Sequence, residues 1–243
     1  MNYLQICQRV AMECGVASGA SIRTAMPTTI GVTGSLERIT NWVNDGWTDI
    51  QMDHDDWDWM RSSVLLGGGV TFATVAGKAS YPLGTIAGTV GVDVDSFGKW
   101  DRPTVRCYPT ATGYISEMYL TEVPFDVWRD EYMLGARRNQ QTRPTVFAVG
   151  PDQSLCLGPP PNSLYTITAD YFVSASEMVS DIDVPIGLPV RFHMLPVYRA
   201  MMKYARYESA AEVYARAEEE NAGMYAQLEA LRAPRITFCG ALA

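Results

Sequence analysis

Along the sequence, the spacing of apolar residues changes from helical to strand-like and back again, and this pattern limits the folds that the chain can adopt. Residues 2–14 and 35–52 place apolar side chains at three- and four-residue spacing, which is typical of amphipathic helices. Helical spacing returns after Pro185, in residues 191–210 and again in residues 210–231. End segments that each bury only one helical stripe must cover each other. The spacing therefore predicts a discontinuous helical bundle built from both ends of the chain.

The middle of the chain is predicted to form β-sheet. Residues 60–185 are rich in Gly, Pro, Thr, Val and Tyr, with short alternating runs between turn signals, which predict antiparallel strands. The clearest runs lie in residues 145–173, where turns at GPDQ and PPPN predict a three-strand meander. One helix is predicted to interrupt the strands after Pro124, where Phe125, Trp128 and Tyr132 share a face.

Together these patterns predict an α+β fold, with an antiparallel β-rich domain inserted into a helical bundle. Residues 1–59 and 186–233 are expected to form the bundle, residues 60–185 the inserted domain, and residues 234–243 an extended C-terminal tail. The chain has 243 residues, of which 47% are hydrophobic. It is therefore long and apolar enough to fold without a metal or a disulfide.

Composition excludes several classes of protein. With 19 Lys and Arg against 27 Asp and Glu, the net charge is −8, which opposes binding along a nucleic-acid backbone. The five cysteines are odd in number and have no CxxC spacing, so reduced thiols are expected rather than a disulfide framework or a zinc site. No signal segment and no apolar run of membrane-spanning length is found, so we expect folding in a cytoplasm.

A cluster of acids follows the second predicted helix: Asp53, Asp55, Asp56 and Asp58, beside His54 and between two tryptophans. Clustered carboxylates are suited to a divalent metal. The calcium-loop pattern fails, however, because Asp58 stands where Gly is needed and Val64 where Glu is needed. A polar helix exit anchored by Trp57 and Trp59 is the favoured interpretation. A metal hydrolase that uses Asp53, His54, Asp55 and Asp56 is kept as an alternative.

The sequence gives little support for nucleophilic catalysis or phosphate binding. Only His54 and His193 are available as catalytic bases, no nucleophile elbow or phosphate loop is present, and His193 is more typical of a helix entrance or core edge. The basic run of Arg137, Arg138 and Arg143 suits a solvated loop better than a phosphate site. The sequence predicts no active site and no cofactor.

Several segments recur together in one family. They are the opening NYLQICQRVAMECG, the later GSLERITNWVNDGWTDIQMDHDDWDWM, FATVAGKASYPL, the region from RPTVFAV to CLGPPPNSLYTITADYF, and the run that begins RFHMLPVYRAMMKYARYESA. In this order, over nearly the whole chain, they resemble the head-to-tail adaptor (connector) proteins of tailed bacteriophages, including the tail tubular protein A type of short-tailed phages.

The resemblance implies a non-enzymatic virion protein, assembled in the host cytoplasm, that binds beneath the portal ring. It would form a twelve-membered ring, extend the DNA channel for genome packaging and ejection, and dock tail or nozzle proteins. It also implies that the C-terminal extension reaches the portal protein, here through Pro234, Arg235, Ile236, Thr237 and Phe238. A tail-completion or tail-terminator protein and an assembly chaperone remain alternatives.

If the chain forms a ring, its net negative charge can act on DNA inside the ring. An acidic lumen would repel DNA phosphates, so that DNA passes without sequence-specific binding. Asp53, Asp55, Asp56 and Asp58 are the acids we expect to line such a channel.

Overall fold

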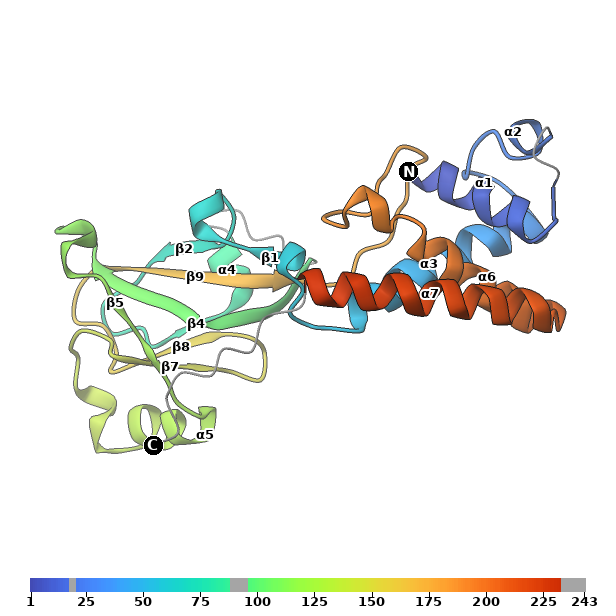
Figure 1. Ribbon diagram of the computed structural model, residues 1–243. Helices are drawn as coiled ribbons and strands as arrows, with labels where there is room; N and C mark the ends of the chain where they lie inside the picture. The colour runs from blue at the N-terminus through green and yellow to red at the C-terminus, as the bar shows by residue number, and fades with distance from the viewer. Residues whose placement is uncertain (18–20, 88–95, 233–243) are drawn as a thin grey trace, which may run out of the picture. The chain divides into compact units, whose positions relative to one another are not determined.

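Two compact units make up the computed structural model, which describes residues 1–17, 21–87 and 96–232 (Figure 1). The helical unit combines Met1–Met60 with Ala175–Ala243, and the β unit is Arg61–Ser174. The predicted α+β class is confirmed. Residues 175–185, which the sequence analysis assigned to the inserted domain, lie in the helical unit.

Four long helices form most of the helical unit: α1 (Tyr3–Glu13), α3 (Ser35–Met52), α6 (Leu195–Glu208) and α7 (Ala211–Arg232). Shorter turns lie between them: α2 (Ile22–Ala25), η1 (Asp58–Met60) and η6 (Val190–Phe192). Helix α1 begins at a capping box, in which the Asn2 side chain accepts from the Gln5 N–H and the Gln5 side chain accepts from the Asn2 N–H. Pro196 lies in the first turn of α6, where its missing N–H leaves no helical bond unmade.

Helix α3 packs on α6, α6 packs on α7, and α1 contacts both α3 and α6. At Gly46, helices α3 and α6 approach closely, because a Cβ added to Gly46 would lie 2.8 Å from the Cβ of Arg199. The apolar positions predicted at helical spacing in residues 210–231 face inward on α7 at Ala217 and Leu228, which are buried, whereas Leu231 at its end is 48% exposed. The periodicity therefore described an internal packing seam along most of this helix.

The β unit contains two sheets. In the first sheet the strand order is β1 (Arg61–Ser62), β9 (Tyr165–Val173), β4 (Phe97–Pro109) and β5 (Met118–Tyr119), with β2 (Val70–Ala73) also paired to β9. In the second it is β3 (Ser80–Tyr81), β8 (Leu155–Gly158), β7 (Val146–Val149) and β6 (Thr121–Glu122). The pairs are antiparallel except β6 with β7, which is parallel.

The predicted three-strand meander is wrong in its last step. Strands β7 and β8 form a hairpin with Phe147 opposite Leu157, but β9 pairs with β1, β2 and β4 in the other sheet. Residues 159–161 between β8 and β9 are all proline. Proline has no N–H to donate to a ladder, so the chain leaves the second sheet here instead of turning back along it.

One apolar cluster lies between the sheets, with Phe72 and Ile167 from the first sheet and Phe147, Leu155 and Leu157 from the second. A smaller cluster covers the outer face of the second sheet. It contains buried side chains from α5 (Phe125–Trp128) and the π-helical turn η4 (Arg129–Met133), which confirms the helix predicted after Pro124. The short helix α4 (Leu83–Ala87), which was not predicted, contributes Ile86 to the main core.

Candidate functional site

The acidic segment after α3 is a tight turn anchored by tryptophan. Trp57 is fully buried, and its indole N–H donates to the Ile50 carbonyl over 2.9 Å. Its ring stacks on Trp59 with centroids 4.3 Å apart, and His54 lies edge-on against it. The sequence interpretation of a polar helix exit held by two tryptophans describes this geometry. The turn fixes the acids at one place on the helical unit.

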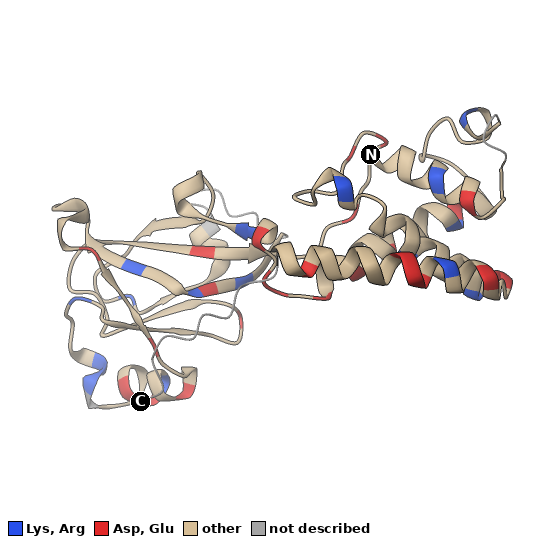
Figure 2. Cartoon of the chain, viewed as in Figure 1, with Lys and Arg blue, Asp and Glu red and all other residues tan. Residues whose placement is uncertain are grey.

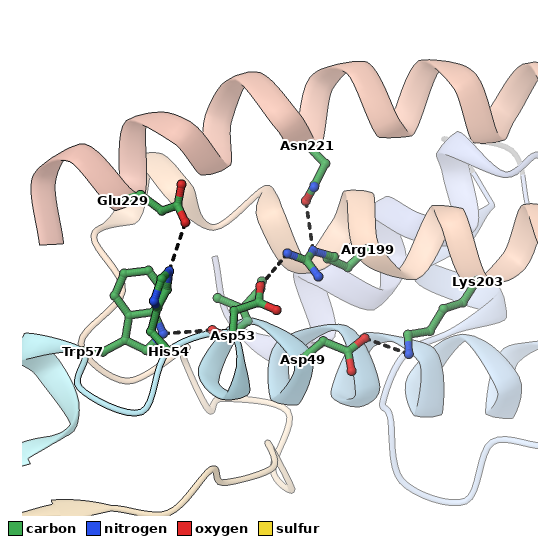
Figure 3. Close-up of polar contacts among 9 residues, drawn as sticks. Asp49, Asp53, His54, Trp57, Arg199, Lys203, Asn221 and Glu229 are labelled. Carbon is green, nitrogen blue, oxygen red and sulfur yellow. Dashed lines mark hydrogen bonds and ion pairs between the residues drawn. The ribbon is translucent and has the colours of Figure 1, made fainter. Parts of the chain in front are cut away.

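Asp53 is held by an arginine that links three helices (Figure 3). The Arg199 guanidinium on α6 donates to the Asp53 carboxylate over 2.6 Å, and through Nε to the Asn221 side-chain oxygen on α7 over 3.2 Å. It also lies over the Tyr225 ring, 5.2 Å from the centroid. Burial raises the pKa of the Tyr225 hydroxyl, and the negative charge of Asp53 raises it further. Asp53 is therefore tied to α6 and α7 through Arg199, although its own side chain is 32% exposed.

Two further polar contacts hold the same helices. His54 Nε2 lies 2.9 Å from a Glu229 carboxylate oxygen on α7, and the Lys203 ammonium on α6 lies 2.8 Å from Asp49 on α3. We call these contacts, together with the Asp53–Arg199 pair, the helix clamp; Figure 3 shows them in one row. Because each joins residues far apart in the sequence, the helix clamp fixes the register of α6 and α7 against α3.

The remaining predicted acids face outward. Asp55 and Asp58 are exposed and Asp56 is half-buried. Within residues 1–17, 21–87 and 96–232, no three His, Cys, Asp or Glu side chains gather closely enough to hold a metal ion. Two of the four metal ligands of the hydrolase alternative contact other side chains of this chain instead: Asp53 contacts Arg199, and His54 contacts Glu229. What the acids offer is a negative surface beside the helix clamp.

Formal charge is divided unequally between the two units (Figure 2). The helical unit has 10 Lys and Arg against 17 Asp and Glu, a charge of −7, whereas the β unit has 9 against 10, a charge of −1. Nearly all of the net charge of −8 therefore belongs to the unit that contains the acidic turn.

Other residues singled out from the sequence have structural roles or lie outside the described ranges. Arg143 is not a loop arginine in solvent, because its guanidinium donates to the carbonyls of Cys107, over 2.9 Å, and Ser116. Arg137 pairs with Glu131. His193 is buried, with Nε2 3.0 Å from the Leu188 carbonyl oxygen. The predicted portal-binding residues Pro234, Arg235, Ile236, Thr237 and Phe238 lie beyond Arg232 and outside the described residues.

Four cysteines in the described ranges are free thiols. Cys7, Cys107 and Cys156 are buried, and burial raises the pKa of all three thiols. Cys14 is half-buried, and burial raises its pKa to about 12. The fifth, Cys239, lies outside the described residues. High pKa values suppress the reactive thiolate, so these thiols behave as small apolar side chains.

Sequence reasoning missed a second polar feature of the helical unit. The side chains of Asn44 and Gln51 on α3 pair with the backbone of Met178 and Ser176, which precede α6 by many residues. Their spacing of seven residues, two helical turns, was visible in the sequence, but nothing there identified the distant backbone that they bind.

Comparison with known proteins gives one family. The model of the SU10 adaptor protein family matches residues 1–237, which is nearly the whole chain. Among curated proteins, none matches this sequence. In the part of the chain that the structure describes, every helix is too short or too polar to cross a membrane.

Proposed function

The chain belongs to the SU10 adaptor protein family and is thus a structural phage adaptor, a component of the virion, and we propose that it works without catalysis between head and tail. In this proposal it docks beneath the portal ring, forms a ring of copies matched to the portal, and extends the DNA channel. Its other face receives tail or nozzle proteins. The match over residues 1–237 carries the proposal.

The charge distribution supports the channel part of the proposal. A ring of helical units brings together many copies of a body with a charge of −7. A lumen lined by such a surface repels DNA phosphates, so the genome slides past without adhering. The predicted channel residues are Asp55, Asp56 and Asp58, with Asp53 partly neutralised by Arg199.

The first experiment measures mass by light scattering for the purified chain, alone and mixed with the portal ring from the same genome. We expect the portal to gain a fixed multiple of 26.8 kDa, the mass of one chain. No complex between two folded partners would contradict portal docking. Binding to a tail tube instead would favour a tail-completion protein.

A second experiment tests the C-terminal tail. Truncation after Arg232 removes Ile236 and Phe238, the residues expected to fill portal pockets. We expect the helical unit to keep its circular dichroism spectrum while portal binding is lost. A double variant, Ile236→Ser with Phe238→Ser, leaves the chain length unchanged and is expected to reproduce that loss. Portal binding at the wild-type level in both variants would refute the role of the tail.

A third experiment tests the channel acids by comparing two variants with equal charge. One replaces Asp55, Asp56 and Asp58 with Asn, and the control replaces Glu218, Glu219 and Glu220, three consecutive acids on α7, with Gln. We expect the first variant to slow DNA packaging or ejection more than the second. Asp53 stays unchanged so that the helix clamp is preserved. Equal rates in both variants would remove support for the acidic turn as channel lining.

A further inference from the structure

The loop before α6 is held rigidly on one side by α3. The Gln51 side-chain amide donates to the Ser176 carbonyl over 2.9 Å and accepts from the Ser176 N–H over 3.1 Å. The Asn44 amide does the same for Met178, over 3.0 and 3.1 Å. Alternate residues of the loop are therefore paired as they would be by a neighbouring strand.

Carboxylates and α1 hold the other side of the loop. The Asp183 carboxylate accepts from the N–H groups of Val179 and Ser180 over 2.8 and 2.7 Å, and its carbonyl accepts from the Tyr3 N–H over 2.7 Å. Asp181 accepts from the Thr29 N–H over 2.6 Å. Hydrogen bonds from Thr28 and Thr29 lower the pKa of Asp181, so it stays ionised. Most of the polar groups of this loop are used internally.

Several of the side chains that this loop presents outward are apolar. Ile182 is 77% exposed and Ile186 is 70% exposed, and with Val184 they surround a cavity of about 310 Å³. We call these three residues the apolar rim. Isolated exposed aliphatic side chains are ordinary, but several grouped around one cavity mark an interaction surface. Because the loop is already ordered, a partner that binds here has little conformational entropy to remove.

The same helical unit carries a second surface of complementary character. A cavity of about 420 Å³ lies between α1 and α2, and its lining mixes apolar side chains, Met1, Met12 and Ile22, with polar ones, Gln5, Gln8, Arg9 and Arg23. Exposed Arg23 at this cavity is opposite in charge to exposed Glu177 beside the apolar rim. Figure 1 shows the loop before α6 by the N-terminal end of α1 and helix α2 nearer its other end. Closed rings of identical subunits join two unlike surfaces of each copy.

We propose that the apolar rim of one copy docks in the α1–α2 cavity of the next copy. The inference rests on the ring in the proposed function and identifies the contact between its subunits. Helical units of charge −7 repel each other, so a contact between neighbouring copies is favoured where apolar side chains are edged by opposite charges. The apolar rim with Glu177 and the cavity with Arg23 offer such a pair of surfaces.

Site-specific photocrosslinking tests the contact in the full chain assembled on the portal. A benzoylphenylalanine replaces Ile182 in one variant and Met52, which is 67% exposed on α3, in the control. We expect only the first to give a product of two adaptor chains, with the crosslinked peptide from residues 1–25. A crosslink from position 182 to the portal, to a tail protein or to another part of the adaptor would overturn the proposal, as would no product.

A charge exchange provides a second test. Arg23→Glu and Glu177→Arg should each raise the adaptor concentration needed for half-maximal assembly several-fold, and the double variant should restore assembly because each copy then carries the reversed pair. A double variant that assembles no better than the single ones would overturn the pairing. Wild-type chain that forms no ring on the portal refutes the proposed function itself, whereas a wild-type ring with the wrong crosslink refutes only this contact.

Discussion

The helical unit and the β unit are stabilised in different ways. In the β unit, one apolar cluster fills the space between two sheets, with large side chains from both. The helical unit also buries apolar side chains, but polar groups join its distant segments: Arg199 to Asp53, His54 to Glu229, and Asn44 and Gln51 to the loop before α6. Directional hydrogen bonds restrict the register of the segments that they join. We infer that the register of the helical unit depends more on specific polar contacts than that of the β unit does.

The largest expected effect concerns the β core. Phe147→Ala removes a fully buried ring and should lower the free energy of unfolding of the β unit by about 3–5 kcal/mol. Hydrogen exchange read by mass spectrometry should show faster exchange in residues 61–174 only. Ile115→Ala, at a side chain that is 94% exposed, is the control and should change little. Equal acceleration in the helical unit would show that the two units do not unfold separately.

The next effect concerns one close contact in the helical unit. Gly187 has a φ of +76°, and an added Cβ would lie 2.2 Å from the Cβ of Trp59. Gly187→Ala should cost roughly 2–4 kcal/mol, from backbone strain plus the clash. Gly67→Ala is the control, because Gly67 has a φ of +82° but open space around it. Urea unfolding should show a much larger loss for Gly187→Ala, and equal losses would contradict the packing against Trp59.

A double-mutant cycle compares ion pairs in the two units. Asp53→Asn and Arg199→Gln should show a coupling energy of about 1–2 kcal/mol, because this pair is partly buried and hydrogen-bonded to Asn221. Arg102 and Glu122 in the β unit lie at a similar distance, 2.7 Å, but are more exposed. Their coupling should be below about 0.5 kcal/mol. A reversed order would contradict the importance of the helix clamp.

The smallest effect is on pH dependence, and it should be confined to the helical unit, which contains both histidines. Burial lowers the pKa of His193 below its usual 6.5. The unfolded chain therefore takes up this proton first as the pH falls, and stability present above pH 6.5 is lost below it. The free energy of unfolding should therefore have a positive slope against pH in this range.

His193→Gln should flatten that slope. Thermal unfolding between pH 7.5 and 5.5 measures it, with hydrogen exchange to separate the two units. The β unit should change little over this range. An unchanged slope in His193→Gln would assign the effect to another group.

Much of the fold could be predicted from periodicity. Residues 35–52 were expected as a helix, and the structure has α3 at Ser35–Met52. Hairpin turns also identified β7 and β8. The partner of β9 could not be predicted, because a strand of alternating residues pairs equally well with several neighbours and only the assembled core selects one.

Polar sites were predicted less completely. The acids after α3 stood out as a local run, so their clustering was found. Arg199, the partner of Asp53, and Glu229, the partner of His54, are more than 140 residues away in the sequence. The apolar rim was not predicted, because isoleucine is usually a core residue and the sequence does not show that the fold leaves Ile182 and Ile186 exposed.

The order of segments in the helical unit also affects when the protein becomes competent during synthesis. Helix α3 leaves the ribosome early, but α6, which packs on it, and α7, which packs on α6, come after the whole β unit. The face of α3 that packs on α6 therefore stays without this partner while more than 100 residues are translated. A chain that terminates early has no α6 or α7 to complete the unit. Completion of the helical unit is therefore linked to completion of the chain.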